Sequence, residues 1–139
     1  MRKFKTTIEP RISDIDFLNH VHTTRFIEYA LAAWDKVTRT SYGELAYYLK
    51  NNNLVWVISA IEIACLRPLT LSDTIDVYTW MDEVLVKETR VGFTIMKNDV
   101  KVAAGGKLKF TLFDQHTGRS KKIPDEVITM ANDVESAED

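Results

Sequence analysis

The sequence predicts an α+β domain in which a curved antiparallel sheet wraps around one central helix. Three features of the 139-residue chain support this class. A strongly apolar helical pattern occurs early, at residues 23–37. Four segments with strand character then follow one another between residues 54 and 114. The run Ala-Ala-Gly-Gly at 103–106 suits a sheet whose backbone passes close to a helix, because small side chains permit that approach.

Composition narrows the class further. Apolar residues make up 45% of the chain and charged residues 27%, which is typical of a soluble globular protein. The formal charge of -2 argues against a nucleic-acid partner bound through bulk positive charge. No apolar run is long enough to span a bilayer, so we expect no membrane insertion. The single cysteine, Cys65, fits a reducing cytoplasm. We expect one domain over residues 1–139.

The first strand is expected at residues 2–12, where Thr, Ile and Phe are frequent and Pro10 indicates an edge or a bulge. A loop should follow, and then a helix from Thr23 or Thr24 to Val37, with one of these threonines as its N-cap. Apolar residues cover most of the circumference of this helix. We therefore expect it to be buried on nearly all sides.

The rest of the chain is expected to add a short helix at 41–52 and an antiparallel meander. Its strands are predicted at 54–68, 73–83, 87–99 and 101–114. The first of these is apolar enough to be covered on both faces for part of its length. Residues 98–101 (Asn-Asp-Val-Lys) predict a hairpin turn. A polar exit segment then leads to an acidic tail, 133–139, that is expected to fray.

The residues that suggest chemistry are gathered just before the central helix. Asp14, Asp16, His20 and His22 lie within nine residues and could form an acid–base centre, a metal site or a capped turn. From residue type and position alone, a capping role is favoured for either aspartate. The two histidines and the two carboxylates could supply nitrogen and oxygen ligands. No distant ligand cluster completes such a set, so we predict neither a metal nor a cofactor.

This stretch, SDIDFLNHVHTTRFIEY (13–29), resembles the signature of hotdog-fold thioesterases of the 4-hydroxybenzoyl-CoA thioesterase type. In that family a D-x-D-x-x-G-H-V-N-N-like segment opens the central helix. LRPL (66–69), DTIDVYTW (73–80) and FDQHTGRSKKIP (113–124) match later segments of the family, so the resemblance covers roughly the whole chain. It implies that the α+β domain is a hotdog domain and that it hydrolyses thioesters.

The resemblance also implies roles for individual residues. The family's catalytic carboxylate falls on Asp16, as nucleophile or general base, while Asp14 keeps the capping role. The backbone amide that polarises the thioester carbonyl falls on Thr23. The family's glycine is replaced by Asn19, which tolerates a left-handed backbone. The carboxylate often found in the second turn of the helix is Leu31 here. These departures bear on the identity of the substrate.

Other residues receive supporting roles. We expect His20 to orient the loop or the carboxylate, and His22, Asn19 and Trp56 to contact the substrate. Trp56 could flank an acyl pocket, although core or subunit packing explains it equally well. Cys65 lies in an apolar strand with no adjacent base, so we interpret it as a buried structural thiol.

The leading functional hypothesis is an acyl-CoA thioesterase that produces a free carboxylic acid and CoA. The family resemblance implies a homodimer or homotetramer with active sites at a subunit boundary. An acyl carrier protein could replace CoA as the carrier. Two further alternatives stay open: a hydratase of the same fold, for which DFLNHV (16–21) lacks the expected proline and places its histidine one residue closer, and a non-catalytic acyl-CoA-binding module.

Overall fold

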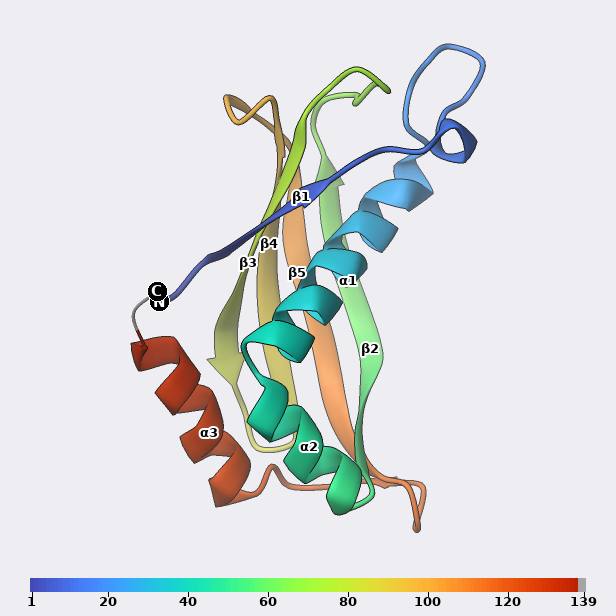
Figure 1. The fold of residues 1–139 in the computed structure, drawn as a ribbon. Coiled ribbons are helices and arrows are strands. Elements are labelled where there is room, and N and C mark those ends of the chain that lie inside the picture. The colour runs from blue at the N-terminus through green and yellow to red at the C-terminus, as the bar shows by residue number, and fades with distance from the viewer. Residues whose placement is uncertain (138–139) are drawn as a thin grey trace.

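The computed structural model describes residues 1–137 and confirms a curved antiparallel sheet around a long helix (Figure 1). The elements, in chain order, are β1 (Phe4–Ile8), a short 3-10 turn (Ile12–Asp14), α1 (Thr23–Thr40), α2 (Gly43–Asn51), β2 (Leu54–Cys65), β3 (Ile75–Val84), β4 (Glu88–Lys97), β5 (Lys101–Asp114), β6 (Arg119–Ser120) and α3 (Asp125–Ser136). The α+β class and the hotdog architecture predicted from the sequence are therefore confirmed.

The strand order is β1-β3-β4-β5-β2, with the two-residue β6 paired to β5. The expected four-strand meander is correct only for β3, β4 and β5. β2 pairs with β5 instead of β3, and the segment after β2 passes beside the residues that precede α1. There the backbone N–H of Val21 donates to the carbonyl of Leu69 at 2.8 Å. β1 and β2 are consequently the two edges of the sheet.

The expectation about the burial of β2 was also wrong. This strand was expected to be covered on both faces for part of its length, but much of it is exposed, including Val57 (43%) and Ile61 (39%). Cys65 at its end is also exposed, so the interpretation of a buried thiol was wrong. An apolar run suits both a covered strand and an apolar edge, and the sequence pattern did not distinguish them.

α1 lies on the concave side of the sheet and packs most closely on β1, β3 and β4 (Figure 1). Its buried face repeats at helical spacing and comprises Phe26, Tyr29, Ala30, Ala33, Trp34 and Val37. The expectation of burial on nearly all sides was too broad, because Ile27 and Leu31 are half-buried and Ala32 is exposed. The N-cap is His22, not Thr23 or Thr24, and no side chain in the described part of the chain caps this end.

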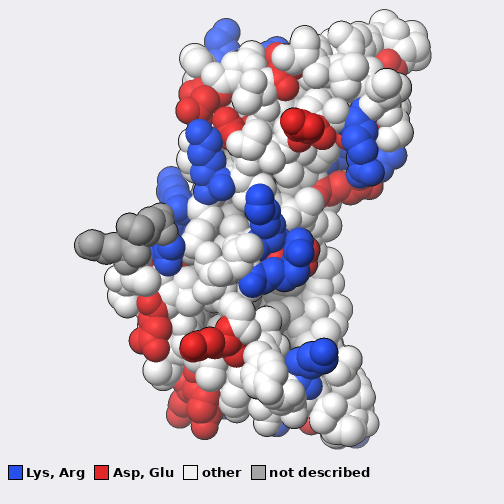
Figure 2. Space-filling model, in the orientation of Figure 1, with Lys and Arg blue, Asp and Glu red and all other residues white. Residues whose placement is uncertain are grey.

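The outward side of α1 carries ion pairs at helical spacing. Arg25 contacts Glu28 at 2.7 Å, and Arg39 contacts Asp35 at 3.0 Å. On the face seen in Figure 2, acidic and basic side chains are interspersed instead of gathered by sign. Such exposed pairs contribute little to stability, so they chiefly keep this side of the helix polar.

The sequence analysis missed α3. Residues 133–136 were expected to fray but form the last turn of this helix, while 138–139 lie outside the described residues. Val127 and Ala131, one turn apart, are buried against the rest of the fold. The helix is held to the N-terminus of the chain, where Arg2 donates from its backbone N–H to Glu135 at 3.0 Å (Figure 1).

The small residues at 103–106 permit a partly different close approach from the one expected. Ala103 and Ala104 are fully buried in the core. At Gly106 an added methyl group would collide with the backbone carbonyl of Glu62 on β2. The close approach at this glycine is therefore between neighbouring strands, not between the sheet and the helix.

Candidate active site

The loop between the 3-10 turn and α1 is a tight structure that fixes the position of Asp16. Ile15 and Val21 form an antiparallel bridge across its base. The backbone N–H of Asp16 donates to the carbonyl of His20 at 2.8 Å. Asn19 has a φ of 62°, a left-handed conformation that asparagine adopts more readily than most residues. The loop therefore holds Asp16 at a defined place before the first turn of α1.

The Asp16 carboxylate is anchored through one oxygen. Its Oδ1 accepts hydrogen bonds from the backbone N–H groups of Leu18 and His20, both at 2.9 Å. Its Oδ2 accepts none from residues 1–137. The His20 N–H holds the pKa of Asp16 below its usual range, and the Leu18 N–H adds to this against the opposing effect of desolvation. Asp16 is therefore ionised at neutral pH and keeps one oxygen available.

Asp14 has the opposite environment. It is 2% exposed, and its Oδ2 accepts hydrogen bonds from the Tyr29 hydroxyl at 2.7 Å and the Arg11 N–H at 2.9 Å. Arg25 lies 3.4 Å from its Oδ1. Burial acts to raise the pKa of Asp14, but these hydrogen bonds and charges outweigh it and lower the pKa. The residue supports the loop and cannot reach a substrate without breaking these contacts.

A polar pocket of about 390 Å³ brings together four of the residues proposed from the sequence. Asp16, His20, His22 and Thr23 all line it. The N–H of Thr23, the first residue of α1, is one of the groups that a helix leaves without an internal acceptor. It also lies at the positive end of the helix dipole. The pocket thus combines a carboxylate with a backbone donor suited to developing negative charge.

His20 contacts Asp16 through its backbone. The described hydrogen bond from His20 to the carboxylate comes from the main-chain N–H, not from the imidazole ring. Any orienting role of this residue therefore depends on the loop conformation. His22 is exposed at the N-cap of α1, on the pocket wall.

Among the pocket residues that were not proposed as site residues, two carry a thiol or a charged group. Cys65 and Arg67 contribute from the end of β2 and the segment that follows it. One guanidinium nitrogen of Arg67 donates to the carbonyl of Val102 at 2.6 Å, which fixes the side chain near the pocket. An arginine here can bind a phosphate or carboxylate group. The available signal was a positive charge at the end of the strand predicted at 54–68, within LRPL.

Two other proposed residues lie outside this pocket. Asn19 is exposed at the tip of the loop, where its backbone conformation explains its presence. Trp56 lines a separate apolar cavity near the opposite end of α1. The structure therefore does not bring Trp56 together with Asp16.

Within residues 1–137, no group of three or more His, Cys, Asp or Glu side chains could hold a metal ion. No helix in the same range is long and apolar enough to cross a membrane. What the pocket does contain is an ionised carboxylate, the backbone N–H of Thr23 and a nearby guanidinium. This arrangement can add an oxygen nucleophile to a carbonyl group and stabilise the oxyanion that results.

The chain is similar to known proteins in sequence and in fold. Residues 10–129 match the family model of the thioesterase-like superfamily. A Staphylococcus aureus protein in complex with CoA has 22% identity and a TM-score of 0.80, over 96% of this chain and 84% of that chain. A probable thioesterase from Escherichia coli has 22% identity and a TM-score of 0.79, over 91% and 94%.

The 12:0-ACP thioesterase from Umbellularia californica has 19% identity and a TM-score of 0.84, over 95% of this chain but 53% of that chain. These structural similarities show a shared fold. No curated protein matches the sequence.

Proposed function

The chain belongs to the thioesterase-like superfamily and is a thioester hydrolase; from this premise, we propose that it hydrolyses acyl-CoA to a carboxylic acid and CoA through Asp16. The observation that supports the proposal most is the Asp16 carboxylate itself. It has one unengaged oxygen and shares a pocket with the unpaired amide at the start of α1. The CoA bound in the Staphylococcus aureus structure supports CoA as the carrier.

The proposed reaction begins when the thioester carbonyl oxygen accepts a hydrogen bond from the Thr23 amide. Asp16 then either attacks the carbonyl carbon or removes a proton from an attacking water. In the first route an Asp16 oxygen–carbon bond forms, the carbon–sulfur bond breaks, and CoA leaves as a thiolate that takes a proton from water. A second water then hydrolyses the mixed anhydride and regenerates the carboxylate.

The environment of Asp16 keeps the carboxylate ionised at neutral pH, which both routes require. The hydrogen bonds from the backbone N–H groups of His20 and Leu18 lower its pKa. Desolvation on substrate binding would raise its reactivity. His20 holds the carboxylate through its backbone N–H, and His22 lines the path of the substrate. Arg67 at the pocket can meet a negatively charged group of the carrier.

We further propose that the protein works as a homodimer or homotetramer assembled through β2. The two sheet edges differ in protection. β1 has five residues, and Lys3, Lys5 and Glu9 are exposed along or beside it. β2 has twelve residues and exposes the apolar Val57 and Ile61. Charged, short edges resist pairing with another chain, whereas long apolar edges favour it.

A panel of acyl-CoA and acyl carrier protein thioesters tests the proposed function. Release of free thiol from acyl-CoA above the uncatalysed rate is the expected result. Release of thiol from the carrier-protein thioesters alone would show that the carrier is acyl carrier protein and not CoA. Saturable binding of acyl-CoA without thiol release would instead indicate a binding module. Hydration of an enoyl-CoA with its thioester intact would indicate a hydratase.

A further inference from the structure

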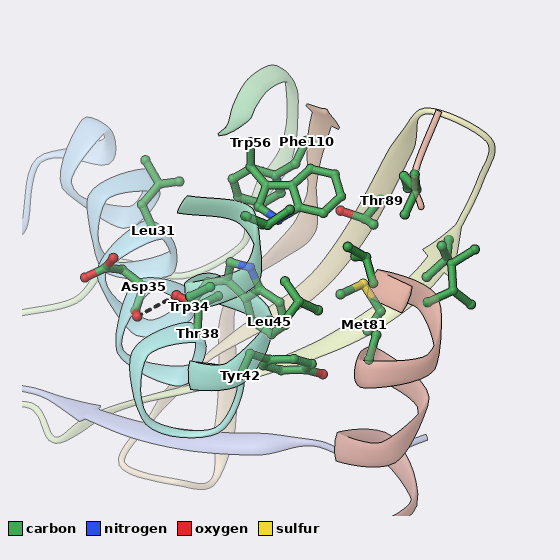
Figure 3. Close-up of a pocket in the computed structure, with 17 residues that line it drawn as sticks. Leu31, Trp34, Asp35, Thr38, Tyr42, Leu45, Trp56, Met81, Thr89 and Phe110 are labelled. Carbon is green, nitrogen blue, oxygen red and sulfur yellow. Dashed lines mark hydrogen bonds between the residues drawn. The ribbon is translucent and has the colours of Figure 1, made fainter. Parts of the chain in front are cut away.

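A second cavity lies at the opposite end of α1 from Asp16. It measures about 360 Å³ and lies between α1, α2, α3 and the sheet (Figure 3). Its lining is apolar apart from Asp35, Thr38, Thr89 and the hydroxyl of Tyr42. The Thr38 hydroxyl already donates to the backbone carbonyl of Asp35 at 2.8 Å. The side chains of Trp56 and Met81 extend into the space from the sheet. Such a cavity suits an apolar ligand.

One face of α1 connects this cavity to the polar pocket. Thr23, Ile27 and Leu31 are spaced four residues apart and therefore lie in one row along the helix. Thr23 lines the polar pocket and Leu31 lines the cavity. Ile27, between them, is half-buried and apolar. The helical rise puts Leu31 about 12 Å from Thr23 along the helix axis.

β2 provides a second row beside the first. Trp56, Ile61 and Cys65 pair across the sheet with Leu112, Leu108 and Ala104. These β5 partners are fully buried in the core, and directly paired residues share a face of the sheet. All three β2 residues therefore face the helix side. Cys65 lines the polar pocket and Trp56 lines the cavity, so this row also runs from the polar pocket to the cavity.

Building on the proposed function, we infer that the natural substrate carries a long aliphatic acyl chain that follows these two rows and ends in the cavity. An extended chain advances about 1.2 Å per bond, so covering about 12 Å takes roughly ten bonds. Acyl groups of roughly ten carbons or more reach the cavity, whereas short or compact aromatic groups leave it empty. Each methylene that enters the cavity leaves water and strengthens binding.

The chain-length preference tests this inference directly. We expect kcat/KM for dodecanoyl-CoA to exceed that for hexanoyl-CoA by at least about tenfold. Ala131, a buried α3 residue on the cavity wall, offers a way to fill the space. Ala131→Leu should lower the dodecanoyl-to-hexanoyl ratio by at least about tenfold. Thr129→Leu adds the same side chain at an exposed position of α3 and should leave the ratio unchanged.

A second filling variant covers the case in which Ala131→Leu does not fold. Ala46 is an exposed residue of α2 that also lines the cavity, so Ala46→Leu adds volume without overpacking the core. It should change the ratio in the same direction. An unchanged ratio in folded variants at both positions would overturn the inference.

Direct binding separates this inference from the proposed reaction. Trp34 and Trp56 line the cavity, whereas Trp80 lies over Gly92 elsewhere on the sheet. In an Asp16→Asn, Trp80→Phe protein, dodecanoate should change the tryptophan fluorescence saturably and hexanoate should not at the same concentrations. A saturable change without acyl-CoA hydrolysis in the unmodified protein would sustain the cavity assignment and contradict the proposed function. Hydrolysis without chain-length preference or fluorescence change would sustain the function and overturn the cavity assignment.

Discussion

The two ends of α1 have opposite chemistry. The N-terminal end forms a polar pocket in which backbone amides hold the Asp16 carboxylate. The C-terminal end forms one wall of an apolar cavity that α3 also lines. The role that we propose for the N-terminal end depends on charge and hydrogen-bond geometry, whereas the role of the C-terminal end depends on the volume of the cavity. We therefore expect substitutions at the N-terminal end to change the rate of the reaction, and substitutions at the other end to change which acyl chains are accepted.

The largest effect is expected from removing the backbone donor at the start of α1. Thr23→Pro deletes the N–H at the first helical position, where proline is well tolerated. The preceding residue, His22, has φ -57° and ψ 138°, which is compatible with a following proline. We expect kcat to fall by about 100- to 1,000-fold, the scale for loss of one oxyanion donor. Steady-state kinetics on acyl-CoA measures this.

Thr23→Ala is the matched control, because it removes the side chain and keeps the amide. It should retain most of the activity. If both variants lost activity equally while remaining folded, the side chain of Thr23 would be the functional group and the amide would have no role.

The next largest effect is expected at Asp14, which supports the loop before α1. Asp14→Asn removes a buried charge that contacts Arg11, Arg25 and Tyr29. We expect a loss of about 3 kcal/mol in the free energy of unfolding, more than an ordinary cap contributes. The pKa of Asp14 is lowered from 3.8, so its stabilisation is complete above that value and is lost as pH falls through the folded-state pKa.

Urea unfolding at neutral pH and at about pH 3 measures this contribution. The stability difference between the unmodified protein and Asp14→Asn should be largest at neutral pH and should shrink in acid. A difference that is independent of pH would show that the charge of Asp14 is not what stabilises the loop.

A smaller effect, on the oligomeric state, is expected at the edge strand β2, which runs between the polar pocket and the apolar cavity. Ala60→Lys with Ala64→Lys places charges on an exposed stretch of this edge strand. Because charged edges resist pairing, sedimentation should show a shift from oligomer to monomer. Thr129→Lys, on an exposed face of α3, should leave the oligomer intact. A monomeric unmodified protein would contradict the proposed assembly.

The sequence was most informative where the relevant residues are close neighbours in the chain. Asp16, His20, His22 and Thr23 span eight residues, so one loop was enough to gather them. β5 was predicted with the bounds that the structure has, because the hairpin turn predicted at 98–101 marks its start. The roles that we assign to these site residues remain proposals.

Features that depend on distant segments were harder to predict. Arg67 reaches the pocket because β2 pairs with β5 and the chain then crosses the start of α1. Nothing in the local pattern specifies that crossing. The apolar cavity also depends on α3, whose starting signals were present but were interpreted as part of a polar exit segment. Pro124 precedes the helix, Asp125 and Glu126 occupy its first turn, and Val127 and Ala131 form its buried side.

We propose that the charge of Asp16, and not its place in the loop, drives hydrolysis. Asp16→Asn keeps an oxygen that can accept the hydrogen bonds of Leu18 and His20 but removes the carboxylate. Asp114 provides the matched control, because its Oδ1 accepts a hydrogen bond from the His116 N–H at 2.8 Å in a loop elsewhere.

The decisive measurement is therefore kcat on a long-chain acyl-CoA for Asp16→Asn and Asp114→Asn, taken beside their melting temperatures. We predict that Asp16→Asn loses at least about a hundredfold in kcat with an unchanged melting temperature, and that Asp114→Asn stays fully active. Equal, small losses in the two variants that follow their melting temperatures would show that Asp16 only shapes its loop, and would contradict the account.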